Sequence, residues 1–171
     1  IKFLLSKNIS IIPSSSKTET EIIEFNNELG EDLPFISENG AAVHNMDLIN
    51  RSLPKKIILS REKNELLKIF KSKISDSLVS KCKFVLNLKE TEKSKIFGLS
   101  GKKLNSALKR QFTIPLLFEG NKNEKNNLSK SIKNSGLSLQ DGGRVTNLCD
   151  KISKALAMKN VIRIFKKTEK E

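Results

Sequence analysis

Short apolar runs and amphipathic segments alternate from the start of the chain. The apolar run 9–12 predicts a short buried strand that stops at Pro13, because proline cannot donate a hydrogen bond to a neighbouring strand. Residues 18–29 place apolar side chains at helical spacing, and residues 34–37 predict a second strand. A strand, a polar loop, a helix and a strand in this order form a βαβ unit. This order predicts part of a parallel α/β sheet.

The helix predicted at 18–29 has a defined beginning, end and inner face. Thr18 and Glu21 stand in the positions of a capping box, and Gly30 is suited to end the helix. The side chains expected to face inward are Ile22, Phe25 and Leu29.

The rest of the chain repeats this alternation and predicts a small open-faced sheet with helices on one side. Residues 121–127 are expected to form a loose loop. The predicted strands are 56–59, 84–88, 114–118, 137–139 and 144–148. The predicted helices are 61–77, 100–110, 128–134 and 153–166.

The amino-acid composition and net charge limit the partners and cofactors that we expect for this chain. The 171 residues include 32 Lys and Arg against 19 Asp and Glu, a formal charge of +13. The basic residues are spread along the chain without an arginine-rich run or an aromatic platform, so we expect no specific nucleic-acid partner. No apolar run is long enough to span a membrane. Cys82 and Cys149 are too few for a disulfide framework or a zinc site, and a single histidine, His44, excludes a His-rich metal centre. We interpret these three residues as structural and expect a cytoplasmic protein.

The serine-rich segment before the helix has two interpretations. Ser14, Ser15 and Ser16 are residue types that commonly cap a helix. Hydroxyl groups and backbone N–H groups at a helix N-terminus also form a seat for a phosphate, since the helix dipole favours an anion there.

Two longer sequence segments favour the phosphate-binding interpretation. The segment 11–18, IIPSSSKT, and the segment 34–43, PFISENGAAV, together resemble the mannosyl-3-phosphoglycerate phosphatases. Residues 98–100, 110–113 and 142–144 agree with that family in order and spacing. The family belongs to the haloacid dehalogenase type of phosphatase, so the resemblance implies an α/β fold: a partial Rossmann-like parallel sheet core with an inserted α/β cap.

The resemblance also implies the domains and the site. Residues 1–45 and 143–171 would be core, and 46–142 the cap that selects the substrate. Ser15 and Lys154 would act on the phosphoryl group, with Lys151 as the alternative lysine. The residues implied to bind substrate are Ser16, Lys17, Asn39, Gly40, Arg110, Thr113 and Arg144. The sequence departs from the family at Gln111 and at Ile152-Ser153.

The family's catalytic aspartate pair and its metal-binding aspartates would lie before and after this chain. We therefore expect the middle portion of a Mg²⁺-dependent phosphatase, with the Mg²⁺ ligands outside the chain and a phosphorylated sugar acid as substrate. The resemblance implies hydrolysis of mannosyl-3-phosphoglycerate, or a related glycosyl-phosphoglycerate, through an aspartyl-phosphate. A truncated, non-catalytic fold that binds sugar phosphates is the alternative, and a basic nucleic-acid-binding protein is a lesser one.

Overall fold

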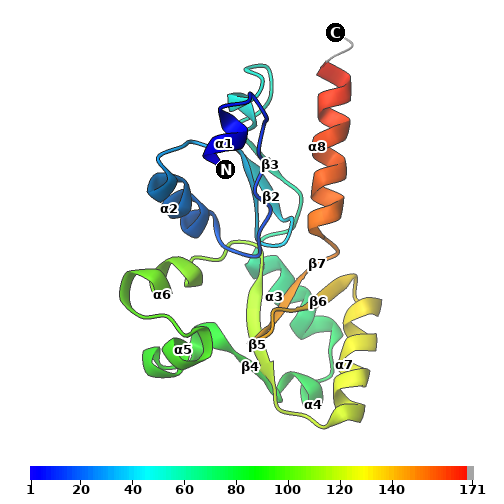
Figure 1. The fold of residues 1–171 in the computed structure, drawn as a ribbon. Helices are drawn as coiled ribbons and strands as arrows, with labels where there is room; N and C mark the ends of the chain where they lie inside the picture. Colours follow the sequence, from blue (N-terminus) through cyan, green and yellow to red (C-terminus); the bar gives the residue numbers. More distant parts are fainter. Residues whose placement is uncertain (169–171) are drawn as a thin grey trace. The chain divides into compact units, whose positions relative to one another are not determined.

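The computed structural model describes residues 1–168, which divide into two compact units. The first unit holds residues 1–59 and the segment from 152 onward, and the second holds residues 60–151 (Figure 1). Residues 169–171, at the end of the segment expected to return to the core, lie outside the described residues.

The first unit contains a three-stranded antiparallel sheet in the order β1-β2-β3. Its helices are α1 (Lys2–Leu5), α2 (Glu19–Leu29), the 3₁₀ helix η1 (Met46–Leu48) and α8 (Lys154–Thr168). Its strands are β1 (Phe35–Ser37), β2 (Ala42–His44) and β3 (Lys56–Ile58). Buried apolar side chains of β1, β2 and η1 pack with Ala157 and Val161 of α8, which gives this unit its own core.

The strand predicted at 9–12 is wrong. The chain pairs in parallel with β1 only further on, where Ile36 N–H donates to Pro13 C=O (2.8 Å) and Ser15 N–H to Ile36 C=O (3.0 Å). Ile9 is 48% exposed. Because β1 is only three residues long, it provides pairing for Pro13 to Ser15 and none for the run before them. The predicted parallel sheet is thus represented by one bridge, between Ser14 and Ile36.

The capping box of α2 is confirmed, but its expected inner face is only partly correct. Thr18 and Glu21 exchange side-chain to backbone hydrogen bonds, and Gly30 ends the helix with φ 72°. Phe25 is 40% exposed, whereas Asn26 is 3% exposed. The Asn26 amide is buried because it donates to Leu33 C=O at 3.1 Å, a partner that lies beyond the helix.

The second unit is built on an antiparallel sheet in the order β4-β5-β7-β6. Its strands are β4 (Cys82–Phe84), β5 (Ile114–Phe118), β6 (Leu137–Asp141) and β7 (Thr146–Asp150). Its helices are α3 (Lys63–Lys73), α4 (Asp76–Val79), η2 (Val85–Asn87), α5 (Glu90–Phe97), α6 (Gly101–Leu108) and α7 (Lys122–Asn134).

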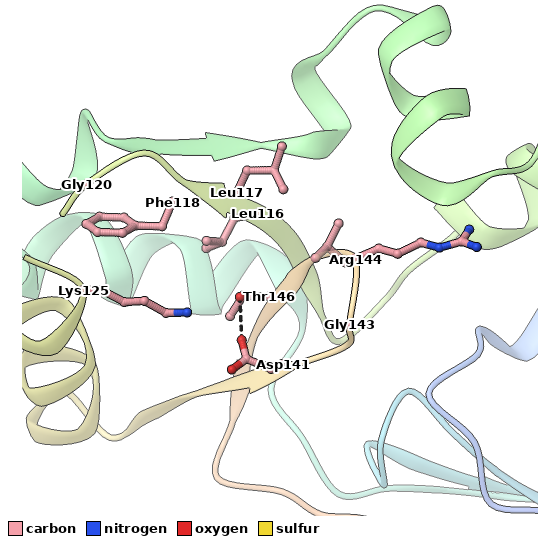
Figure 2. Close-up of a pocket in the computed structure, with 10 residues that line it drawn as sticks. Leu116, Leu117, Phe118, Gly120, Lys125, Asp141, Gly143, Arg144 and Thr146 are labelled. Carbon is pink, nitrogen blue, oxygen red and sulfur yellow. Dashed lines mark hydrogen bonds between the residues drawn. The ribbon is translucent and has the colours of Figure 1, made fainter. Parts of the chain in front are cut away.

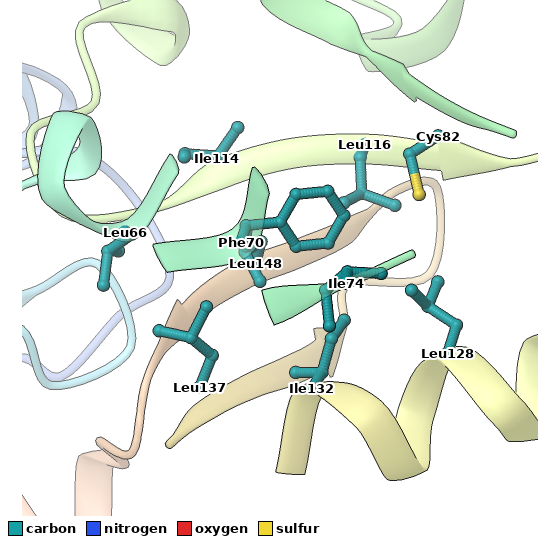
Figure 3. Packing of buried hydrophobic residues seen from close by; sticks show 10 residues of the cluster. All are labelled: Leu66, Phe70, Ile74, Cys82, Ile114, Leu116, Leu128, Ile132, Leu137 and Leu148. Carbon is teal, nitrogen blue, oxygen red and sulfur yellow. The ribbon is translucent and has the colours of Figure 1, made fainter. Parts of the chain in front are cut away.

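The core of the second unit lies between its sheet and two of its helices. Leu66 and Phe70 of α3 and Leu128 and Ile132 of α7 pack on the side chains of β5, β6 and β7 (Figure 3). The predicted packing of helices on one face of the sheet is therefore confirmed for α3 and α7. Figure 1 shows α5 and α6 on the other side of β5 from α3 and α7, an arrangement that the sequence pattern did not predict.

Helix α5 and the first half of α7 escaped the sequence pattern because neither has a fully buried side chain. Helix α5 buries none of its residues, so it has no apolar stripe to detect. The predicted loop 121–127 is instead the beginning of α7, where Asn121 and Glu124 form a capping box. The burial of α7 is confined to Leu128 and Ile132 in its second half. Both errors follow from relying on hydrophobic periodicity.

The compact units divide after Leu59 and after Lys151, away from the positions proposed from the sequence, 45/46 and 142/143. Strand β3 belongs to the first unit because it pairs with β2. The hairpin of β6 and β7 stays whole in the second unit.

An ion pair joins the two ends of the second unit. The Arg61 guanidinium donates to both carboxylate oxygens of Asp150 at 2.9 and 2.8 Å, and the Arg61 backbone N–H adds a third bond at 3.1 Å. The hydrogen bonds from Arg61 lower the pKa of Asp150 to about 2. Arg61 and Asp150 thereby hold the two ends of this unit together.

Candidate functional site

The serine-rich loop and the turn after β1 are joined by backbone hydrogen bonds. Asn39 N–H donates to Ser15 C=O at 2.9 Å, and Glu38 N–H donates to Lys17 C=O at 2.9 Å. Together with the pairing of Ser15 and Ile36, these bonds hold the loop beside the turn over its whole length. The structure therefore brings together Ser15, Lys17 and Asn39, which the resemblance implied as site residues.

The turn from Ser37 to Gly40 is a tight reversal in the left-handed region. Glu38, Asn39 and Gly40 have φ values of 44°, 63° and 104°. The Ser37 carbonyl accepts hydrogen bonds from the N–H groups of Gly40 and Ala41, both at 3.0 Å. Asn39 and Gly40 are residue types that tolerate a positive φ, which suits them to this turn.

Gly40 brings the turn against the beginning of α8. A Cβ atom at position 40 would lie 2.6 Å from the Ser153 carbonyl carbon and 3.0 Å from the Lys154 nitrogen. Ser153 also caps α8, since its Oγ accepts from Leu156 N–H at 3.1 Å. Only a residue without a side chain permits this approach, which places Lys154 next to the turn that holds Ser15.

The approach distinguishes the two candidate lysines. Lys154 is the first residue of α8 and its backbone is in contact range of Gly40. Lys151 belongs to the second unit, where its N–H donates to Asp150 at 2.8 Å. Of these two lysines, Lys154 is therefore the one whose backbone lies next to the turn that holds Ser15.

Two of the expected phosphate ligands have partners within the chain. Ser15 Oγ accepts from Lys17 N–H at 3.2 Å, the short-range bond of a serine that shapes its own loop. Lys17 Nζ pairs with Glu21 Oε1 at 2.9 Å, although its side chain remains 57% exposed. Ser16 is exposed at the bend between them. The N-termini of α2 and α8 both belong to this region, which favours an anion.

The expected substrate residues of the second unit form two separate groups of contacts. Arg110 and Thr113 are buried together, with Arg110 Nη1 donating to Thr113 Oγ1 at 2.9 Å. Arg144 lies in the turn between β6 and β7, and its guanidinium donates to the Phe97 carbonyl at the end of α5. In this structure Arg144 therefore caps a helix C-terminus.

A hollow of about 420 Å³ lies beside that turn, on the second unit. Lys125 points into it from α7, and Asp141 accepts a hydrogen bond from Thr146 at 2.8 Å (Figure 2). Figure 2 shows the guanidinium of Arg144 directed away from Lys125 and Asp141. The hollow is thus open to solvent and polar, and Arg144 contributes to its wall without pointing its charge into it.

A buried polar network beside the serine-rich loop was missed by the sequence analysis, which treated His44 as structural. His44 is 3% exposed and stacks on Phe35 with ring centroids 4.5 Å apart. Its Nε2 lies 2.9 Å from Ser37 Oγ and its Nδ1 lies 3.3 Å from a Glu19 carboxylate oxygen. Burial, aided by the charge of Lys56 and opposed by Glu19, lowers the pKa of His44 to about 4.

We expect this pKa to make the fold less stable in acid. Between the ordinary histidine pKa of 6.5 and about 4, the unfolded chain binds a proton that the folded chain does not. The free energy of unfolding should therefore fall as the pH drops from 7 to 4, by at most about 3 kcal/mol from this residue. Urea unfolding of the protein and of its His44→Phe variant between pH 7 and pH 4 would measure the contribution of His44 to this loss of stability. If the two free energies of unfolding changed in parallel with pH, the expectation would be refuted.

The described residues do not provide a Mg²⁺ site. No group of three or more His, Cys, Asp or Glu side chains lies close enough to hold a metal ion anywhere in residues 1–168 for which side chains are described. Near the serine-rich loop, the Glu21 carboxylate pairs with Lys17 and accepts a hydrogen bond from the backbone N–H of Thr18, the N-cap of α2. Both cysteines are buried thiols in the second unit, and burial raises their pKa values to about 11 and about 12.

Comparison with known proteins shows the family and the fold of the chain. The model of the haloacid dehalogenase-like hydrolase family Hydrolase_3 matches residues 1–170. The chain belongs to this family. Its α/β fold is that of haloacid dehalogenase-like (HAD) hydrolases, and none of its described helices is long and apolar enough to cross a membrane. No curated protein matches it in sequence.

Solved structures share the fold at low sequence identity. The Thermoplasma acidophilum protein 0175 is 14% identical with a TM-score of 0.60, and the match covers 97% of this chain and 60% of that one. A haloacid dehalogenase-like hydrolase from B. subtilis is 12% identical with a TM-score of 0.59, covering 96% and 70%. A sugar phosphatase of HAD subclass IIB is 14% identical with a TM-score of 0.58, covering 96% and 65%. The chain thus spans 60% to 70% of the length of these structures.

Proposed function

We propose that this chain is the phosphate-holding and substrate-selecting portion of a cytoplasmic, Mg²⁺-dependent phosphatase. The observation that carries the proposal is the close approach of Gly40 to Ser153 and Lys154. This approach places the turn that is bonded to Ser15 next to Lys154, the first residue of α8. The Ser15 hydroxyl and the Lys154 ammonium group thus belong to two segments that are far apart in the sequence but neighbours in the fold.

The chemistry available to these residues is binding and charge stabilisation. Ser15 Oγ accepts from Lys17 N–H and donates its own proton to a phosphoryl oxygen. Lys154 offsets the negative charge that the phosphoryl group shares with an attacking carboxylate, the role a cation has in phosphoryl transfer. The attacking aspartate and the Mg²⁺ ligands would come from residues outside this chain. Transfer to that aspartate and hydrolysis of the aspartyl-phosphate would divide one difficult displacement into two easier ones.

The proposed substrate is mannosyl-3-phosphoglycerate or a related glycosyl-phosphoglycerate. The match to the motifs of that phosphatase family supports this choice. The sugar phosphatase of subclass IIB with the same fold supports a small phosphorylated substrate. Arg110, Thr113 and Arg144 are the proposed contacts to the glycerate carboxylate and the sugar, because an arginine presents a planar fork to a carboxylate.

Phosphate binding by the chain itself tests the proposal. Inorganic phosphate titrated at constant ionic strength should shift the NMR amide signals of Ser15, Asn39, Gly40 and Lys154. Ser15→Ala should weaken the affinity roughly 10-fold, since one hydrogen bond to a charged group contributes about 1.5–3 kcal/mol. Lys154→Ala should weaken it by a similar factor.

Two matched controls separate the site from the general positive charge. Ser129→Ala removes an exposed hydroxyl from α7, and Lys122→Ala removes the ammonium group at the first residue of that helix. Both should leave the affinity unchanged. Equal losses in Lys122→Ala and Lys154→Ala would mean that the +13 charge alone attracts phosphate, and the proposal would fail.

Turnover tests the catalytic part of the proposal. In a protein that joins this chain to the missing aspartates, Ser15→Ala and Lys154→Ala should each lower kcat on the order of 100-fold, the scale of losing one group that stabilises transition-state charge. Their free energies of unfolding should change far less. Phosphate binding without Mg²⁺-dependent turnover in that joined protein would favour the non-catalytic sugar-phosphate-binding alternative.

A further inference from the structure

A row of three side chains crosses the sheet of the first unit beside the phosphate loop. Phe35 of β1, His44 of β2 and Lys56 of β3 are direct partners in the strand register. The His44 ring stacks on Phe35, and Lys56 Nζ pairs with a Glu19 carboxylate oxygen at 2.8 Å. Glu19 is the first residue of α2 and also faces His44 Nδ1. The row therefore reaches from the sheet to the beginning of the helix.

The geometry determines which nitrogen of His44 carries the proton. The ionised Glu19 carboxylate can only accept, so Nδ1, at 3.3 Å, must be the protonated nitrogen. In the neutral ring Nε2 is then the acceptor, and the Ser37 hydroxyl donates to it at 2.9 Å. Ser37 is 1% exposed, which excludes it as a nucleophile for a substrate in solution.

Ser37 and Glu19 stand at the two ends of the phosphate-binding backbone. Ser37 begins the turn, and its carbonyl accepts from Gly40 N–H and Ala41 N–H. Glu19 follows Thr18, the N-cap of the helix to which the serine loop leads. Between these ends lie the two backbone bonds that join the turn and the loop, from Glu38 and Asn39.

We infer that His44 is a positioning residue for phosphate binding, because its imidazole ties the turn at Ser37 to the start of α2 at Glu19. This inference rests on the proposed function, which assigns phosphate to the loop and turn. His44 itself does not contact the phosphate. It keeps the Ser15 hydroxyl and the Asn39–Gly40 backbone in one arrangement, so that binding need not order them.

Three variants test separately the two hydrogen bonds of the His44 imidazole, the one from Nδ1 to Glu19 and the one that Nε2 accepts from Ser37. His44→Phe keeps a ring to stack on Phe35 and removes both hydrogen bonds. His44→Asn keeps a donor near the position of Nδ1, and His44→Gln keeps a polar group near the position of Nε2. With inorganic phosphate as the probe and NMR as the readout, we expect His44→Phe to weaken binding about 5- to 10-fold. The Asn and Gln variants should lie between it and the unsubstituted protein.

A destabilised control distinguishes positioning from loss of stability. Leu53 is 6% exposed and belongs to the apolar core cluster of the first unit, which includes none of Glu19, Ser37 and His44, so Leu53→Ala should lower the stability but keep the phosphate affinity. If His44→Phe does not fold, Ser37→Ala removes the hydrogen bond to Nε2 alone and should weaken binding in the same direction. Imidazole ¹⁵N shifts should show the Nδ1–H tautomer in the unsubstituted protein.

The outcomes are separable. Weaker binding in Ser15→Ala with unchanged binding in His44→Phe and Ser37→Ala would overturn the role of His44 and leave the proposed function standing. Unchanged binding in Ser15→Ala would overturn the proposed function. An Nε2–H tautomer, or equal loss of affinity in Leu53→Ala and His44→Phe, would also overturn the positioning role. No saturable binding by the unsubstituted protein would overturn both.

Discussion

Gly40→Ala is expected to destabilise the first unit by roughly 3 kcal/mol or more and to abolish phosphate binding. A side chain at φ 104° adopts a backbone conformation that costs about 1–3 kcal/mol. The new Cβ would also overlap the Ser153 carbonyl carbon at 2.6 Å, and forced overpacking costs about 1–3 kcal/mol more. Relief of this overlap requires the turn and the beginning of α8 to separate, which moves Lys154 away from the turn. Urea unfolding and phosphate titration would measure the two effects.

Gly30→Ala is the matched control for Gly40→Ala. Gly30 also has a positive φ, 72°, but a Cβ there would meet nothing within 4 Å. This substitution should cost about 1 kcal/mol, the left-handed penalty alone, and leave phosphate binding intact. Equal costs for the two variants would show that the contact between Gly40 and α8 does not matter.

Phe70→Ala is expected to lower the stability of the second unit by about 3–5 kcal/mol, the range for removing a fully buried aromatic side chain. Phe70 is 0% exposed and makes an edge contact with Phe84, with ring centroids 5.8 Å apart. It lies among the side chains of α3 and the sheet that form this core (Figure 3). Hydrogen exchange of the β5 and β7 amides would report the loss.

Phe3→Ala is the control for Phe70→Ala. It removes the same side chain from a position that is 72% exposed, and it should change the stability by less than about 0.5 kcal/mol.

In Phe70→Ala, the hydrogen-exchange rates of the backbone amides in β1 and β2 should change less than those in β5 and β7, because the two units have separate cores. Equal protection in Phe70→Ala and the unsubstituted protein would contradict the packing described for the second unit.

Local signals in the sequence were sufficient for the elements whose ends depend on neighbouring residues. The capping box at Thr18 and the stop at Gly30 determine α2 within one helical turn at each end. The apolar run at 114–118 became β5 with the predicted bounds. Helix α5 escaped notice because it buries no side chain, and periodicity detects only helices that pack.

For the candidate site, the sequence by itself determined the residue types and their order: hydroxyl groups before a helix, a turn suited to glycine, and a lysine at the start of a later helix. Only the tertiary structure decided which of them meet. Gly40 reaches Ser153, Lys17 pairs with Glu21, Arg144 turns to the Phe97 carbonyl, and His44 joins Ser37 to Glu19. Lys17 and Glu21 are one helical turn apart, and Ser37 and His44 lie seven residues apart on neighbouring strands, whereas the other contacts join residues distant in sequence. Their partners are selected by sheet register and helix packing, which no local pattern of residues encodes.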